Sequence, residues 1–145
     1  IPLSSIIKKD FYIIPKEYVT KDPENGNAGF NIKIVNDEEE TSQFIEATIY
    51  QEDEIYYYVD METFEDGDVI IKPDSQATYV VKDKKPLEGV YSINKGYAVF
   101  RKIIIIDQND EYCIVETGTK YGISQFDHIV RNGNSVKEDD ILFNG

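Results

Sequence analysis

The chain has 145 residues with 28 acidic and 15 basic side chains, and its net charge of −13 sets the first limits on function. Such a negative field repels phosphate backbones and anionic lipid headgroups, which argues against nucleic-acid binding and electrostatic membrane docking. No run approaches the roughly 20 apolar residues that span a bilayer, and no secretion signal is recognisable. Because the chain opens at Ile1 on strand-like sequence, we expect a fragment or processed form of a longer protein.

Short apolar runs interrupted by Gly, Asn and Asp predict many strands and little helix. In chain order the expected strands cover residues 5–7, 11–14, 30–35, 44–50, 55–60, 69–72, 77–81, 89–94, 97–106, 112–116 and 127–131. Polar and glycine-rich composition predicts flexible loops at 22–29 and 36–42. The predicted fold class is therefore all-β, with two small barrel-like or sandwich-like modules at 1–85 and 86–145.

An internal repeat is indicated when ATIYQEDEIYYYVD (47–60) is laid over IIIIDQNDEYCIVE (103–116). Both segments read as four strand formers, four polar residues, a short strand and an acid. A turn and a further strand follow each of them, so the two modules are expected to be related by duplication. Structural turns are predicted at Gly67, Asp68, Gly96, Gly118, Gly122 and Asp127, where glycine or aspartate interrupts the strands.

The reactive side chains give little support for catalysis. His128 is the only histidine, so the sequence gives little support for a metal site with several histidine ligands or for a catalytic triad. We expect His128 at a strand edge or turn. Cys113 is the only cysteine; it excludes an internal disulfide, and its apolar neighbours predict a buried, inert thiol.

The acidic runs offer oxygen atoms that calcium could use, and the spacing of Asp107, Asn109 and Glu111 is faintly similar to a calcium loop. That segment lacks the central glycine and the distant bidentate glutamate which such a loop needs. A polar tip between strands is the simpler interpretation. No catalytic residue, metal or cofactor is predicted.

Eleven tyrosines and no tryptophan raise the question of a binding surface. Strand alternation places Tyr56 and Tyr58 on one face and Tyr57 on the other. Partial burial with hydroxyls at the rim is the preferred interpretation. The alternative is an interaction surface formed by Tyr56, Tyr58, Tyr121 and Phe126.

Three segments carry a resemblance to a known family. They are the opening IPLSSI, the segment GVYSINKGYAVFRKI and the ending EYCIVETGTKYGISQFDHIV. Together they resemble the C-terminal β region of HlyD-like adaptors, also called membrane fusion proteins, of the kind found in Gram-positive Firmicutes. Pro2 and Ser4 match the start of that pattern and residues 94–96 match its glycine turn. Gly118, Asp127, Ile129 and Val130 match its ending, whereas Phe126 stands where glycine is usual.

The resemblance implies a non-enzymatic efflux or secretion adaptor. Its β region would lie outside the cytoplasm near the cell membrane, held there only by an upstream anchor absent from this sequence. It would contact a membrane transporter of the ABC or RND type and neighbouring adaptor copies, and residues 86–145 would be the membrane-proximal-like module. Two alternatives stay open: an extracellular ligand- or glycan-binding β domain using the tyrosines, and a hydrolase using two acids that the sequence does not pair.

Overall fold

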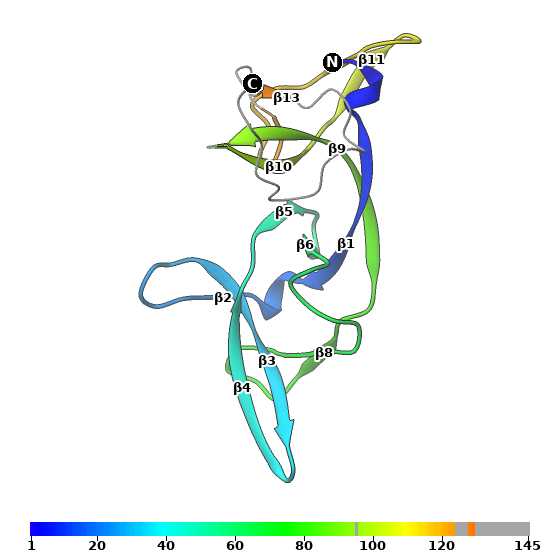
Figure 1. Ribbon diagram of the computed structural model, residues 1–145. Coiled ribbons are helices and arrows are strands. Elements are labelled where there is room, and N and C mark those ends of the chain that lie inside the picture. Colours follow the sequence, from blue (N-terminus) through cyan, green and yellow to red (C-terminus); the bar gives the residue numbers. More distant parts are fainter. Residues whose placement is uncertain (95, 124–127, 130–145) are drawn as a thin grey trace. The chain divides into compact units, whose positions relative to one another are not determined.

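The computed structural model describes residues 1–94, 96–123 and 128–129 (Figure 1). Of the described residues, 57% lie in strands and 5% in helices, and the strands make a nearly closed barrel-like sheet and a half-barrel sheet. The expected all-β class with little helix is therefore confirmed. No helix in the described ranges has the length and apolar character needed to cross a membrane.

Two short 3-10 helices and a series of strands make up the described chain. The helices are η1 (Leu3–Ser5) and η2 (Lys16–Tyr18). The strands are β1 (Ile7–Pro15), β2 (Thr20–Lys21), β3 (Ala28–Asn36), β4 (Glu39–Glu46), β5 (Ile49–Glu52), β6 (Tyr56–Asp60), β7 (Val69–Ile71), β8 (Thr78–Val80), β9 (Lys84–Asn94), β10 (Tyr97–Lys102), β11 (Ile105–Gln108), β12 (Cys113–Val115) and β13 (His128–Ile129).

The chain divides into two compact units. Unit 2 is continuous and comprises Asp10–Lys85, whereas unit 1 combines Ile1–Lys9 with Pro86–Gly145. Both boundaries fall inside strands, one in β1 and the other in β9. Strand β10 and most of β9 belong to unit 1, whereas β5, β6 and most of β1 belong to unit 2.

Each unit has its own apolar cluster. In unit 2 the buried cluster contains Tyr12, Ile14, Tyr18, Phe30, Ala47, Val59, Phe64, Ile70 and Val81. Phe30 and Phe64 meet edge to face at 5.9 Å between ring centroids, a favourable aromatic geometry. In unit 1, Val90, Ile103 and Ile123 form a smaller buried cluster.

Several expected strands have different limits. Residues 5–7 and 11–14 are not separate strands, because η1 precedes a single nine-residue β1. The polar residues Lys8 and Asp10 look like a break in the sequence but are exposed members of the strand. The short β2 was not expected at all; it pairs with the start of β3.

Two expected strands are each broken into two. Within 44–50, β4 ends at Glu46; the Ala47 amide makes the last bond of its ladder, to the Ala28 carbonyl at 3.0 Å, and β5 then pairs with β6. Within 97–106, β10 ends at Lys102; the Ile103 amide makes the last bond of its ladder, to the Glu88 carbonyl at 3.0 Å, and β11 then pairs with β12. In both cases the chain changes its pairing partner inside an apolar run.

The predicted loop at 36–42 is wrong. Residues 39–42 belong to β4, which pairs with β3 over eight residue pairs from Gly29↔Glu46 to Asn36↔Glu39. Only Asp37 and Glu38 make the turn, and Asp37 has a positive φ of 54°. The predicted loop at 22–29 is also too long, since β3 begins at Ala28. Figure 1 shows β3 and β4 as a long hairpin.

The internal repeat is visible in the hairpins β5–β6 and β11–β12. Ile49↔Val59 in the first corresponds to Ile105↔Val115 in the second, and each ladder has an irregularity directly after that pair. The turns are also built alike. One side-chain oxygen of Asp53 accepts the amides of Ile55 and Tyr56, at 2.8 and 2.6 Å. One oxygen of Asn109 accepts the amides of Glu111 and Tyr112, at 2.9 and 2.8 Å.

The same correspondence extends to the preceding hairpins, β3–β4 and β9–β10. Gly29 pairs with Glu46, and Gly89 pairs with Lys102. In both hairpins a phenylalanine ring, Phe44 or Phe100, covers the glycine so closely that a Cβ would collide with it. The hairpins differ in length, since β9 and β10 form six residue pairs and β3 and β4 form eight.

The duplication also includes an Ile-Pro segment before each 3-10 helix. Pro2 is bridged to Tyr112, and Pro15 is paired with Tyr56, the equivalent tyrosine. The residue after each proline then donates its amide to the hairpin turn: Leu3 to Glu111 at 2.7 Å and Lys16 to Ile55 at 2.9 Å. Both units are therefore built on one plan, from an Ile-Pro segment, a 3-10 turn and two hairpins.

Candidate functional site

In the described part of unit 1, the hairpin β11–β12 carries an exposed apolar face. This face consists of Ile104, Ile106, Tyr112 and Ile114, whose exposed fractions are 41%, 60%, 52% and 63%. The alternate residues Ile103, Ile105 and Val115 pack inward with the apolar cluster of this unit, as the two-residue period of strands requires. Contiguous exposed apolar groups of this kind mark interaction surfaces more often than they mark ordinary surface.

The duplicated plan provides an internal comparison for this apolar face. Ile114 corresponds to Tyr58, which is only 8% exposed and donates its hydroxyl to Asp53 Oδ2 at 3.3 Å. Ile106 corresponds to Tyr50, whose ring lies 5.3 Å from that of Phe11. In the described part of unit 1, the two positions that unit 2 covers with its own side chains are therefore aliphatic and exposed.

One edge of this hairpin is occupied by residues of the chain itself. The Ile1 nitrogen donates to the Cys113 carbonyl at 2.7 Å, and the Cys113 amide donates to the Ile1 carbonyl at 2.6 Å. Together with the bridge between Pro2 and Tyr112, these bonds place the extended residues Ile1 and Pro2 alongside the second strand of the hairpin. They tie the hairpin to the first residues of unit 1, and Ile104, Ile106, Tyr112 and Ile114 stay exposed.

Acidic residues border the apolar face. Tyr112 lines a hollow of about 120 Å³ together with Asp107. It also lines a second hollow of about 390 Å³ together with Asp110 and Glu111. The face therefore combines an aliphatic centre with a negative rim, which matches a partner with an apolar centre and basic groups around it.

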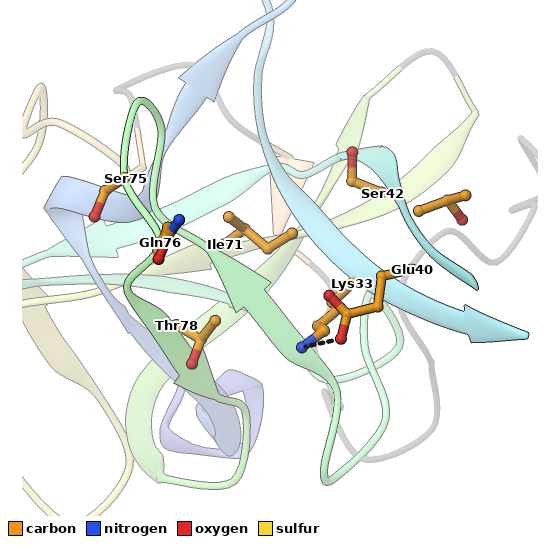
Figure 2. Close-up of a pocket in the computed structure, with 8 residues that line it drawn as sticks. Lys33, Glu40, Ser42, Ile71, Ser75, Gln76 and Thr78 are labelled. Carbon is orange, nitrogen blue, oxygen red and sulfur yellow. Dashed lines mark ion pairs between the residues drawn. The ribbon is translucent and has the colours of Figure 1, made fainter. Parts of the chain in front are cut away.

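Unit 2 carries a polar groove of about 680 Å³ on the outer side of the sheet that contains β3, β4, β7 and β8. Figure 2 shows the Lys33 ammonium facing the Glu40 carboxylate, an ion pair of 3.0 Å. The other residues that line the groove are Thr41, Ser42, Ile71, Ser75, Gln76 and Thr78. All of them except Ile71 are polar, and neither Tyr56 nor Tyr58 lines the groove.

A second polar cluster of unit 2 joins Tyr12, Asp66 and Lys84. The buried Tyr12 donates its hydroxyl to Asp66 Oδ1. Lys84 Nζ lies 3.2 Å from an oxygen of the same carboxylate. The hydrogen bond to Asp66, helped by burial, raises the pKa of Tyr12 to about 12. The hydrogen bonds from Tyr12 and Lys84 lower the pKa of Asp66. The cluster anchors the turn of Gly67 to the core.

The predicted turn residues fall into two groups. Gly67, Gly96 and Gly118 have positive φ values of 97°, 85° and 73°, which glycine adopts without strain. Asp68 supports the first of these turns by accepting the Glu65 amide at 2.9 Å. At Gly122 the space is the constraint, because a Cβ would collide with Thr119 Oγ1. Asp127 lies outside the described residues.

The residues of the predicted tyrosine surface are divided between the two units. Tyr58 is buried, which leaves little of its ring accessible. Tyr56 is half-buried, with Lys85 Nζ 5.7 Å from its ring centroid. Tyr121 belongs to unit 1 and has a positive φ of 66°. Phe126 lies outside the described residues.

The two residues considered for reactivity, Cys113 and His128, lie in or beside strands. Cys113 is buried, with 2% of its surface exposed, and occupies the position of Tyr57 in the repeat. The backbone of His128 pairs with that of Ile93 through β13 and β9. Across the described ranges, no three His, Cys, Asp or Glu side chains come together as a possible metal site.

Sequence reasoning missed the apolar face because the run of four isoleucines reads as one buried strand. The available signal was the two-residue period of the strands, which places Ile104 and Ile106 on one face and Tyr112 and Ile114 on one face across the turn. Comparisons with known proteins add no further information: no family model matches the chain, and no curated protein or solved structure is significantly similar to it.

Proposed function

We propose that the protein is a non-enzymatic adaptor module whose function is contact with other proteins. In this proposal it belongs to an HlyD-like membrane fusion protein and lies on the extracytoplasmic side of a cell membrane. The upstream part of the parent protein anchors it there. Its partners are a membrane transporter, of the ABC or RND type, and neighbouring adaptor copies. The resemblance of the sequence to the C-terminal β region of such adaptors supports this role.

The apolar face of β11–β12 is the observation that carries the proposal. Four large apolar side chains are exposed there, while the equivalent hairpin of unit 2 buries Tyr58 and packs Tyr50 on Phe11. Burial of aliphatic groups against a partner is favourable at roughly 25 cal/mol per Å². A hairpin that exposes four large apolar side chains is suited to contact with another protein.

The acidic rim adds a requirement for the partner. Asp107, Asp110 and Glu111 border the apolar face through the two hollows that Tyr112 shares. A transporter surface with basic groups around an apolar patch satisfies both features, and opposite charge also speeds encounter. Densely hydrogen-bonded hairpins give the contact a defined shape.

The experiment that tests this role places a photo-crosslinking amino acid at Ile106 or Ile114 in the full-length parent protein, in its own cells. A crosslink from these positions to a transport protein of the membrane is expected. Val35 and Ile55 serve as matched controls, because their exposed fractions of 58% and 62% are similar but they lie in unit 2. Neither control position is expected to crosslink to the transporter.

A second experiment introduces charged residues into the apolar face and measures export. Ile106→Asp combined with Ile114→Asp should reduce export of the transported substrate by at least tenfold, whereas Val35→Asp with Ile55→Asp should leave it unchanged. Unaltered export in the first variant, with no transporter crosslinked, contradicts the proposal. Binding to a glycan array that is lost in Tyr56→Ala would instead favour the ligand-binding alternative.

A further inference from the structure

The outer edge of β4 in unit 2 is a second surface with its own chemistry, separate from the apolar face. Within the described part of the chain, β3 is the only strand that pairs with β4. The edge is eight residues long and extends from Glu39 to Glu46. A strand edge of this length is a template for a further strand.

The register determines which backbone groups are free at this edge. The Ala47 amide donates to Ala28, so odd-numbered residues direct their amides and carbonyls toward β3. Because this direction alternates along an antiparallel pair, the even-numbered residues direct theirs outward. The outward groups belong to Glu40, Ser42, Phe44 and Glu46.

The duplicated unit supplies a precedent for adding backbone at this edge. Lys102 of β10 is equivalent to Glu46 of β4, since both pair with the glycine that opens their hairpin. The Lys102 amide donates outward to the Tyr121 carbonyl at 3.2 Å, and Lys102 forms a parallel bridge with Gly122. At the equivalent edge of β4, the described residues supply no such segment.

The negative charge of the β3–β4 hairpin indicates which class of segment could pair with the edge of β4. Between residues 28 and 46 the hairpin has five acids and one lysine, with three consecutive glutamates at 38–40. Glu39 and Glu40 lie on β4 itself and Glu46 ends it. A second copy of this strand would bring the same acids together and is disfavoured by repulsion. An extended basic segment satisfies both the open backbone and the negative charge.

We propose that the outer edge of β4 binds an extended, lysine- or arginine-rich peptide segment as an additional β-strand. The segment pairs with the outward amides and carbonyls of Glu40, Ser42, Phe44 and Glu46. Its basic side chains meet the acids at both ends of the strand. This inference does not depend on the adaptor role, because it concerns a different unit and a different surface.

The probe is a synthetic ten-residue peptide that alternates lysine with threonine, added to the full chain. Binding is followed by fluorescence anisotropy, and the pairing geometry by amide hydrogen exchange in NMR spectra. Slowed exchange is expected at Glu40, Ser42, Phe44 and Glu46, while the odd-numbered amides of β4 are already protected. A peptide of the same sequence with alternate amides N-methylated keeps its charge but cannot pair, so it should bind at least tenfold more weakly.

Protein variants separate pairing from simple charge attraction. Ser42→Pro removes one outward amide and should weaken binding about tenfold. Glu38→Gln with Glu39→Gln should weaken it more than Glu54→Gln with Glu62→Gln, which removes the same charge elsewhere in unit 2. Equal binding of the methylated peptide, or protection absent from the four outward amides, would overturn the proposal. The exchange result on the unaltered protein decides the question even if Ser42→Pro fails to fold.

Discussion

The Tyr12–Asp66–Lys84 cluster makes a prediction that can be tested by pH. Tyr12 is 3% exposed and its hydroxyl donates to Asp66. The substitution Tyr12→Phe deletes that hydroxyl and keeps the ring in the core. A hydrogen bond to a charged acceptor contributes about 1.5–3 kcal/mol, but the acceptor is at the surface and solvent screens it. We therefore expect Tyr12→Phe to lower the free energy of unfolding by about 1 kcal/mol at pH 8.

The pH dependence follows from the two pKa shifts. The pKa of Tyr12 is raised from 10.0 to about 12 in the folded protein. Its stabilising contribution is therefore complete below pH 10 and is lost as the pH rises from 10 to 12, since the unfolded tyrosine ionises first. The pKa of Asp66 is lowered by Tyr12 and Lys84. Its contribution is present above the ordinary pKa of an aspartate, near 4, and is lost as the pH falls below that value.

The measurement is urea unfolding of both proteins at pH 3, 7, 9 and 11.5. The difference between them should be largest at pH 7 and 9 and should shrink at both extremes. Tyr79→Phe is the matched control, because the Tyr79 hydroxyl donates to the uncharged Ile13 carbonyl at 2.8 Å. Its pKa is also raised to about 12, mainly by burial, so it should share the alkaline loss but not the acid loss. A Tyr12 difference that is unchanged at pH 3 would refute the role of Asp66.

Three further predictions concern the stability of unit 2. Phe30→Ala should cost about 3–5 kcal/mol in urea unfolding, because Phe30 is fully buried against Phe64; the exposed Val35→Ala should cost less than about 0.5 kcal/mol, and equal losses would contradict this packing. Gly29→Ala should cost about 2 kcal/mol, since the new Cβ would collide with the Ile45 carbonyl oxygen; an unchanged melting temperature would exclude that approach. Asp37→Gly should add about 0.5 kcal/mol, because Asp37 has a φ of 54°, and a lower melting temperature would argue against this turn.

Local pattern was sufficient to predict the fold class and the repeat. The hairpin turns at Asp53 and Asn109 follow from polar residues between two strand formers, and a side-chain oxygen caps both turns in the same way. Alternation alone could not locate the long β4, because its first residues are a run of glutamate, threonine and serine that resembles a loop. Those residues form a strand because β3 offers them a partner in register.

The two broken strands show a second limit. Ala47 and Ile103 stand at equivalent places in the repeat, and each donates its amide back to the start of its own hairpin. An apolar run contains no local sign of where the chain changes partner. The apolar face was missed for the same reason, since buried Ile103 and exposed Ile106 are chemically identical in the sequence. Only tertiary pairing distinguishes them.

The discontinuity of unit 1 determines the order in which the chain can fold during synthesis. The Ile1 nitrogen bonds to a carbonyl 112 residues later, at Cys113, whereas unit 2 is complete once Lys85 has emerged. At translation rates of 5–20 residues per second, Ile1 waits on the order of ten seconds after its own synthesis for Cys113 to be made. During that time residues 1–9 lack their partners in unit 1, whereas all the residues of unit 2 are already present.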